Sequence, residues 1–205
     1  MHQIETYQTG SIVVGTAVEA SLSSGLARME AARENKRRIM EGALSVETQI
    51  TGIIVLHFFP EQTERKTEFD LMILRAVWCS FSAKRKLVAW VVQNRKLLSG
   101  PDWNRCDKLL RETMAFRNAF THGHLLVEHE AVFLAYFEGR PRKQELTDEF
   151  LIKVEETLTQ TYHSMEDIAV RSGTTTRTTS FRPQAGDELQ ISHRQLRNSA
   201  ATKLF

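Results

Sequence analysis

The chain has 205 residues, 41% of them hydrophobic and 25% charged, which is typical of a globular protein that can bury a core without disulfides. No apolar run approaches the roughly 20 residues that cross a bilayer, and the start of the chain lacks the basic residues of a secretory signal, so we expect a cytoplasmic protein with no membrane partner. The formal net charge is only +2, with six basic and two acidic residues in 171–205, so the body is no general polyanion binder and could contact a nucleic acid only through a local site.

The first 37 residues are expected to form a peripheral N-terminal extension. Glycines interrupt its first half, and a polar, helix-favouring stretch then predicts helix from about Ala17. The domain itself is expected over residues 38–171. Its first helix is predicted at 38–59, where apolar residues recur at steps of four and three until Pro60 ends the helix.

A second helical region is predicted at residues 66–98. It keeps the same apolar stepping, but Ser82 is suited to cap a new helix, so the region could be two helices with a bend. Lys84 and Lys86 belong to a basic face in this region. Such a face is usually just solvated, although it could also form the wall of an RNA cleft.

The next helix is predicted to begin at Asp102, which is suited to cap it, and to end near Gly123, which is suited to the left-handed position after a helix. The period then changes, and residues 125–127 and 131–137 predict a short β-hairpin inserted after this helix. Thr147 is expected to cap a last helix. The fold class is therefore mainly α, an antiparallel helical bundle with a small hairpin.

The remaining features are expected to be structural. Residues 172–205 are rich in Thr, Ser, Arg and Gln without apolar periodicity, so we expect a basic, disordered tail. With only two cysteines, the chain is neither a disulfide scaffold nor a Cys-type zinc module. The following residues are expected in the core: Trp78, Trp90, Trp103, Cys79 and Cys106.

One short segment, residues 116–123, combines groups that could carry chemistry. Arg117 offers a permanent charge for a phosphate, and His122 titrates near neutral pH. Asn118 lies four residues before His122, hence on the same helical face, where its amide could fix the tautomer of the imidazole. These are the groups needed to cleave RNA without a metal, because the reaction requires a base, an acid and a cation for the phosphate.

The same residues also have ordinary structural interpretations. Arg117 could pair with Glu112 or Asp107, and His122 could be a helix C-terminal residue favoured by the helix dipole. Three histidines lie close together in residues 122–129, but no nearby cysteine completes a familiar zinc pattern, so we expect no metal and no cofactor.

The pattern Arg-Asn-x-x-x-His-Gly at the end of a helix resembles the signature of the HEPN superfamily (higher eukaryote and prokaryote nucleotide-binding domains). The upstream context is similar too, with an aromatic cluster at residues 57–60 and Phe-x-x-Lys at residues 81–84. The resemblance implies a helical bundle that dimerises so that two Arg/His motifs face each other. It implies that His122 is a general acid/base, that Arg117 binds the scissile phosphate and that Asn118 positions either.

The resemblance also implies a function, namely a metal-independent endoribonuclease that forms a 2′,3′-cyclic phosphate in a toxin–antitoxin, phage-defence or stress setting. RNA, a second copy of the chain and an antitoxin are the implied partners. Some toxin members carry a modified Tyr two residues after the His, where this chain has His124, so that mode of silencing is not expected. Besides the three motif residues, we expect Lys84, Lys86 and His124 to contact RNA, although His124 could be a solvent-facing hairpin residue. The alternative function is a non-catalytic HEPN-like dimer that binds nucleotide, RNA or a partner protein.

Overall fold

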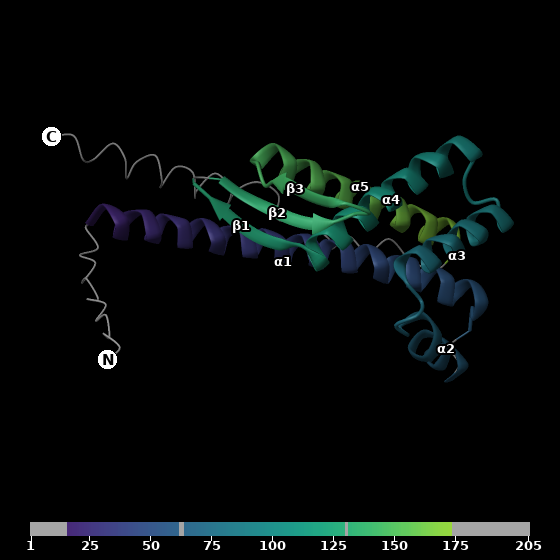
Figure 1. The fold of residues 1–205 in the computed structure, drawn as a ribbon. Coiled ribbons are helices and arrows are strands. Elements are labelled where there is room, and N and C mark those ends of the chain that lie inside the picture. Colours follow the sequence, from purple (N-terminus) through teal and green to yellow (C-terminus); the bar gives the residue numbers. More distant parts are fainter. Residues whose placement is uncertain (1–15, 62–63, 130, 174–205) are drawn as a thin grey trace.

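The computed structural model describes residues 16–61, 64–129 and 131–173, with side chains from Ser23 onward. The chain is mainly helical with one small antiparallel sheet, as predicted (Figure 1). The elements in chain order are α1 (Thr16–Phe58), α2 (Glu64–Phe69), the π-helix η1 (Asp70–Leu74), α3 (Phe81–Asn94), α4 (Gly100–His122), β1 (His124–Glu128), β2 (Ala131–Phe137), β3 (Pro141–Glu145) and α5 (Asp148–Arg171).

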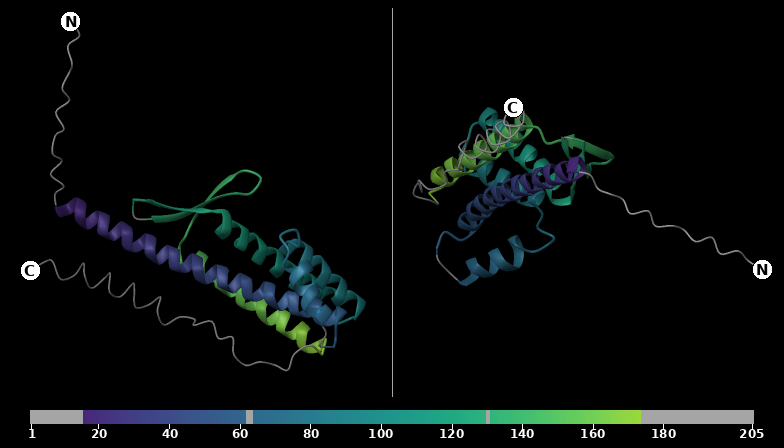
Figure 2. Two further views of the ribbon diagram at one scale, coloured as in Figure 1. Left: turned by 90° about the horizontal axis from the view of Figure 1, so that it is seen from below. Right: turned by 90° about the vertical axis from the view of Figure 1, so that its left-hand side faces the viewer.

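Helix α1 is the long axis of the molecule, and α5 and α4 pack along it (Figure 2). Gln49 Nε2 donates to the Tyr162 hydroxyl of α5 at 3.1 Å, and Gly42, about two turns earlier on α1, lies against Leu158, about one turn earlier on α5, so α1 and α5 run parallel. Helix α4 runs in the opposite direction to both. The boundary predicted between residues 37 and 38 falls inside α1, which is continuous from Thr16.

The core divides into two apolar clusters along this axis. The larger cluster joins the C-terminal half of α1 with α3, the first half of α4 and the end of α5. The smaller one joins Ile39 and Ala43 of α1 with the end of α4, the middle of β2 and the start of α5. Between α4 and α5, the fully buried Thr113 and Thr161 hydroxyls lie 2.9 Å apart. Thr161 donates to its own helix at Thr157, so Thr113 is the donor of this bond.

The second helical region differs from its prediction. Residues 66–98 are broken into α2, η1 and α3, and α3 is capped by Ser80, whose hydroxyl accepts from the Ala83 N–H at 3.3 Å, rather than by Ser82. The apolar stepping therefore loses register between η1 and α3. As a result Trp78 and Trp90 are exposed, contrary to prediction, whereas Trp103 is buried as expected.

The ends of the later helices follow capping chemistry. Ser99 caps α4 by accepting from the Asp102 N–H, so the predicted cap, Asp102, lies in the first turn instead. Thr147 caps α5 as predicted. The predicted hairpin is present as β1 and β2, in a register that pairs Leu126 with Phe133, but a third strand, β3, adds to β2 and was not expected.

One segment of α1, Ser23–Phe58, is long and apolar enough to span a membrane by length and composition, with a mean hydropathy of 1.3 over its most apolar window. In the structure 44% of that window is buried inside the protein. Core helices pass the same test, and the buried residues of α1 belong to both apolar clusters. This property alone therefore does not assign α1 to a membrane.

Candidate functional site

The residues of the Arg-Asn-x-x-x-His-Gly motif occupy the last two turns of α4. Ala119 and Phe120 fix these turns in the smaller apolar cluster, which leaves Asn118 and His122 exposed. The helix ends at Gly123, whose backbone is extended (φ −82°, ψ 153°) rather than left-handed, so the predicted reason for the glycine is wrong. The observed reason is space, because a Cβ there would lie 2.4 Å from the Ala119 carbonyl oxygen and 2.7 Å from Leu134 Cδ1.

Arg117 points toward α1 and meets Glu47 there. Its Nη2 lies 3.7 Å from Glu47 Oε2, and its Nη1 donates to Asn118 Oδ1 at 3.4 Å. The Arg117 Nε is buried and has no hydrogen-bond partner among the described residues, while the side chain as a whole is 30% exposed. The guanidinium is thus held only by long contacts and still presents N–H donors to a ligand.

Glu47 is shared between Arg117 and Lys84. The Lys84 ammonium donates to Glu47 Oε1 at 2.7 Å, and the lysine side chain is only 6% exposed. The interpretation of Lys84 as part of a solvated face is therefore wrong. One carboxylate between two cations leaves a local charge of +1, and the tightly bonded Lys84 occupies one carboxylate oxygen while Arg117 remains near the surface.

His122 and Asn118 line a cavity of about 410 Å³ between the end of α4, the end of β2 and the first turn of α5. Within the described part of the chain His122 makes no hydrogen bond or ion pair, so Asn118 does not fix the imidazole as expected. The Asn118 oxygen accepts from Arg117 instead. The structure therefore brings Asn118 next to Arg117 and also into the His122 cavity, but it does not join Arg117 to His122.

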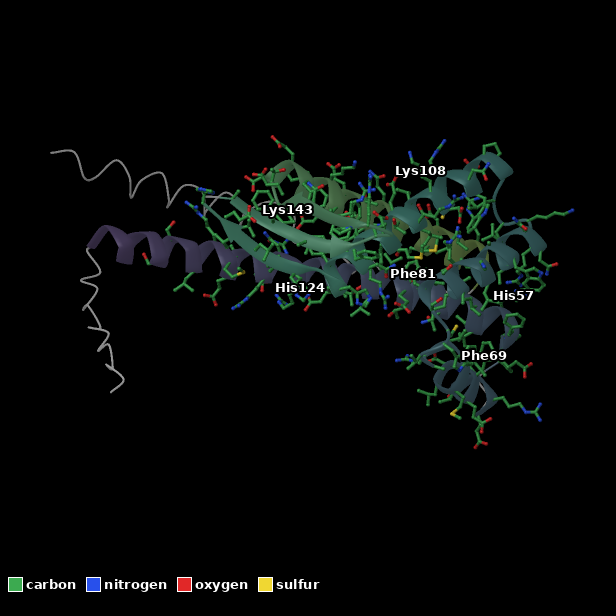
Figure 3. All side chains as sticks on the ribbon, viewed as in Figure 1. His57, Phe69, Phe81, Lys108, His124 and Lys143 are labelled. Atoms are coloured by element: carbon green, nitrogen blue, oxygen red, sulfur yellow. The ribbon has the colours of Figure 1, made fainter. Side chains whose placement is uncertain are left out.

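The two other residues predicted to contact RNA are separate from this cavity. Lys86 is exposed on α3. His124 is exposed at the start of β1, opposite Ala135 of β2. Figure 3 places His124 where the sheet lies along α1, well away from His57 near the other end of that helix.

The structural alternatives for Arg117 are excluded by the observed pairs. Asp107 is buried and accepts from Arg85 and Arg111, and the nearest cation to Glu112 is Lys108, at 4.0 Å. Sequence reasoning missed Glu47, the actual partner. Its only local signal is that an acid directly follows Val46, one of the buried apolar positions of the first predicted helix.

Other reactive groups do not converge here. Among the residues that the structure describes, no group of three or more His, Cys, Asp or Glu side chains could hold a metal ion. Cys79 and Cys106 are buried and unpaired, as predicted. Burial, reinforced by the nearby Asp107 charge, raises the pKa of the Cys106 thiol to about 12, which makes it a poor nucleophile.

Comparisons with models of protein families, with curated proteins and with solved structures find no match to this chain. The site thus offers two side chains for chemistry, the partly exposed Arg117 and the exposed His122, and a cavity that His122 and Asn118 both line.

Proposed function

We propose that the chain is a metal-independent endoribonuclease of the HEPN type that acts on RNA in the cytoplasm as a homodimer. The observation that carries the proposal is the end of α4, where the Arg117 side chain is 30% exposed and makes only long contacts, of 3.7 Å to Glu47 and 3.4 Å to Asn118, and the exposed His122 follows within one and a half turns. A guanidinium can bind a phosphate with two parallel hydrogen bonds, and an imidazole can exchange a proton near neutral pH.

The proposed reaction needs no cofactor. A base removes the proton of a ribose 2′-hydroxyl, and the resulting oxygen attacks the adjacent phosphorus while the bond to the 5′-oxygen breaks. The leaving oxygen takes a proton from an acid, and the products are a 2′,3′-cyclic phosphate and a 5′-hydroxyl end. Arg117 stabilises the charge that develops on the phosphate oxygens. With one motif histidine per chain, a two-fold dimer supplies the base from one copy and the acid from the other.

A second candidate function is a HEPN-like dimer that binds nucleotide, RNA or a partner protein without cleaving. The observation that favours it is that Arg117 pairs with Glu47 and is not joined to His122 within the chain. This alternative predicts the same binding surface but no product ends.

The deciding experiment is cleavage of total RNA in excess EDTA by the parent, Arg117→Ala and His122→Ala proteins. Loss of a general acid or base lowers the rate by about 10²–10⁴-fold, and we expect at least this loss for His122→Ala. Two matched variants control for charge and fold. Arg111→Ala removes an arginine of the same helix that is 65% exposed, and His163→Ala removes an exposed histidine of α5.

Both controls should cleave like the parent, and circular dichroism melting should show that all variants fold. If folded Arg117→Ala and His122→Ala proteins cleave like the parent, the assigned roles are wrong. If the folded parent binds RNA but forms no new 5′-hydroxyl ends on any RNA tested, the binding function replaces the catalytic one.

A further inference from the structure

The cavity beside His122 has a size and a lining that suit a particular ligand. Its volume of about 410 Å³ lies within the range of roughly 300–1,000 Å³ that is typical of small-ligand pockets. Its walls come from the end of α4, the end of β2 and the turn after it, and the first turn of α5. These elements are far apart in the sequence, so the cavity is a product of the fold.

Four aromatic residues are among those that line the cavity. Phe116 and Phe150 meet edge to face, with ring centroids 6.0 Å apart, and Tyr136 and Phe137 of β2 are also lining residues. Phe137 is 73% exposed, although its neighbours on β2 are at least partly buried. An exposed aromatic ring beside an aromatic cavity offers a free face on which a flat ring can stack.

The polar groups of the lining favour a neutral ligand over an anionic one. Asn118, His122 and Glu138 are the strongly polar residues that line the cavity, and neither Lys nor Arg does so. A phosphate inside this cavity would face the Glu138 carboxylate and no lysine or arginine of the lining, since Arg142, whose Nε lies 3.8 Å from Glu138 Oε2, is outside it. A neutral, flat molecule with hydrogen-bonding edges fits the lining, because its faces can stack and its edges can pair with the amide and the carboxylate.

The phosphate-binding group lies on the adjoining side of the same helix. Arg117 and Asn118 are successive residues, hence about 100° apart around α4, and they contact each other at 3.4 Å. A strand of RNA that crosses the helix at this point would place a phosphate on Arg117 and the attached base toward Asn118. The group that would bind the phosphate and the cavity that would hold the base thus lie on neighbouring faces of one helical turn.

We propose that this cavity holds an unpaired nucleobase of single-stranded RNA, next to the phosphate bound by Arg117. The inference rests on the proposed function for its substrate, and it adds the part of the substrate that is recognised. Phe137 stacks on the base at the mouth of the cavity, and Asn118 and Glu138 contact its edges. Double-stranded RNA is excluded as the substrate at this site, because its bases are stacked within the helix and cannot enter.

The test uses four nucleosides without phosphate (adenosine, guanosine, cytidine and uridine), titrated by calorimetry and saturation-transfer NMR. We expect saturable binding of at least one nucleoside to the parent protein. Phe137→Ala should weaken that binding, and raise KM for RNA cleavage, by roughly 5- to 100-fold. Phe137→Tyr keeps a ring and should weaken binding less than Phe137→Ala does. Phe137 is mostly exposed, so both variants should fold.

The control is Phe58→Ala, which removes a half-exposed aromatic ring of the His57 and Trp90 cluster and should change neither quantity. Absence of saturable binding by all four nucleosides, or equal affinities for the parent and Phe137→Ala, overturns the inference. Nucleoside binding that depends on Phe137 without RNA cleavage leaves the cavity assignment intact and removes the proposed function. Cleavage that depends on His122 but not on Phe137 does the reverse.

Discussion

Two acid-centred clusters lie between the helices, and they differ in how firmly they hold their cations. Glu47 of α1 binds Lys84 and Arg117, and Asp107 of α4 binds Arg85 and Arg111. Helix α3 supplies one cation to each cluster, because its successive residues Lys84 and Arg85 pair with different acids.

The Asp107 cluster is the more closely bonded of the two. Both oxygens of Asp107 accept hydrogen bonds, including one of 2.9 Å from Arg111 Nε, and Arg111 is a neighbour on the same helix. In the other cluster only the Lys84 contact with Glu47 is a hydrogen bond, because the ion pair from Arg117 is 3.7 Å long. A cation held this loosely can take an external anion without losing a strong internal bond. The comparison therefore assigns Asp107 to stability, and it makes Arg117 of the Glu47 cluster the cation on which the proposed phosphate binding depends.

The largest effect is expected from removing the Glu47 charge. Glu47→Gln leaves Lys84 as a buried ammonium without a counter-ion, so the free energy of unfolding should fall by about 3–5 kcal/mol. Asp107→Asn should cost less, because Arg111 is mostly exposed and can turn to water and because a guanidinium is more weakly hydrated than an ammonium. Urea unfolding of the two variants beside the parent measures both free energies.

A second variant separates the buried lysine from other effects of the Glu47 change. In Glu47→Gln/Lys84→Met the buried pair becomes a neutral amide and an apolar chain, which should restore most of the lost stability. A double variant no more stable than Glu47→Gln, or an Asp107→Asn protein that is the less stable of the two single variants, would contradict the expectation that the uncompensated Lys84 charge is the largest cost.

This contrast also shows what could be predicted from the sequence. The helix predicted over 38–59 and the Thr147 cap follow from short-range patterns, namely apolar spacing and a capping hydroxyl, whereas the end of α4 at Gly123 was placed correctly from a left-handed backbone that the glycine does not adopt. The pairing of Arg117 with Glu47 joins residues on different helices, and no local pattern specifies which acid an arginine will meet. The motif could therefore be found from the sequence, but its orientation toward α1 could not.

Strand β3 was missed for a related reason. Its residues Pro141–Glu145 are mostly exposed and show no alternation of apolar and polar side chains. Edge strands commonly look like this, because proline and charged residues there prevent pairing with another chain. The pairing of Leu134 with Gln144 and the neighbouring pairs are made by the backbone, which the side-chain pattern does not reveal.

An intermediate effect is expected at Gly123, the single residue that connects α4 to β1. Its carbonyl oxygen accepts a hydrogen bond of 3.0 Å from Lys36 Nζ. Gly123→Ala would force a Cβ against the Ala119 carbonyl oxygen and Leu134, so we expect a loss of about 1–3 kcal/mol from overpacking. Thermal unfolding measures the loss. Gly25→Ala is the matched control, since a Cβ at that helical position meets no atom within 4 Å and should be neutral or stabilising. An equal response at both glycines would mean that the close approach at Gly123 is absent in solution.

The smallest effect is expected at His57. This titratable group extends the comparison because, unlike Lys84, it is not paired with an acid in the described residues. His57 lies edge-on to Phe58 and Trp90, its Nδ1 is buried, and it has no hydrogen-bond partner for that atom within the described ranges. Burial, followed by the charge of Arg95, lowers the pKa of His57 below its ordinary value of 6.5. The unfolded chain therefore binds a proton more readily than the folded one below about pH 6.5, and folding stability should fall as the pH drops from there toward the lower folded pKa.

Urea unfolding at pH 7.5, 6.5, 5.5 and 5.0 tests this dependence on parent and His57→Phe proteins. The variant keeps an aromatic ring against Trp90 but cannot titrate, so its free energy of unfolding should decline less between pH 6.5 and 5.0. Above pH 7 the free energies of the two proteins should change with pH in the same way. Equal declines would mean that His57 is protonated in the folded protein as easily as in the unfolded chain. His57 would then carry a positive charge among aromatic rings at no cost in stability. The contrast with Lys84, whose buried charge is paired with the Glu47 carboxylate, would fail.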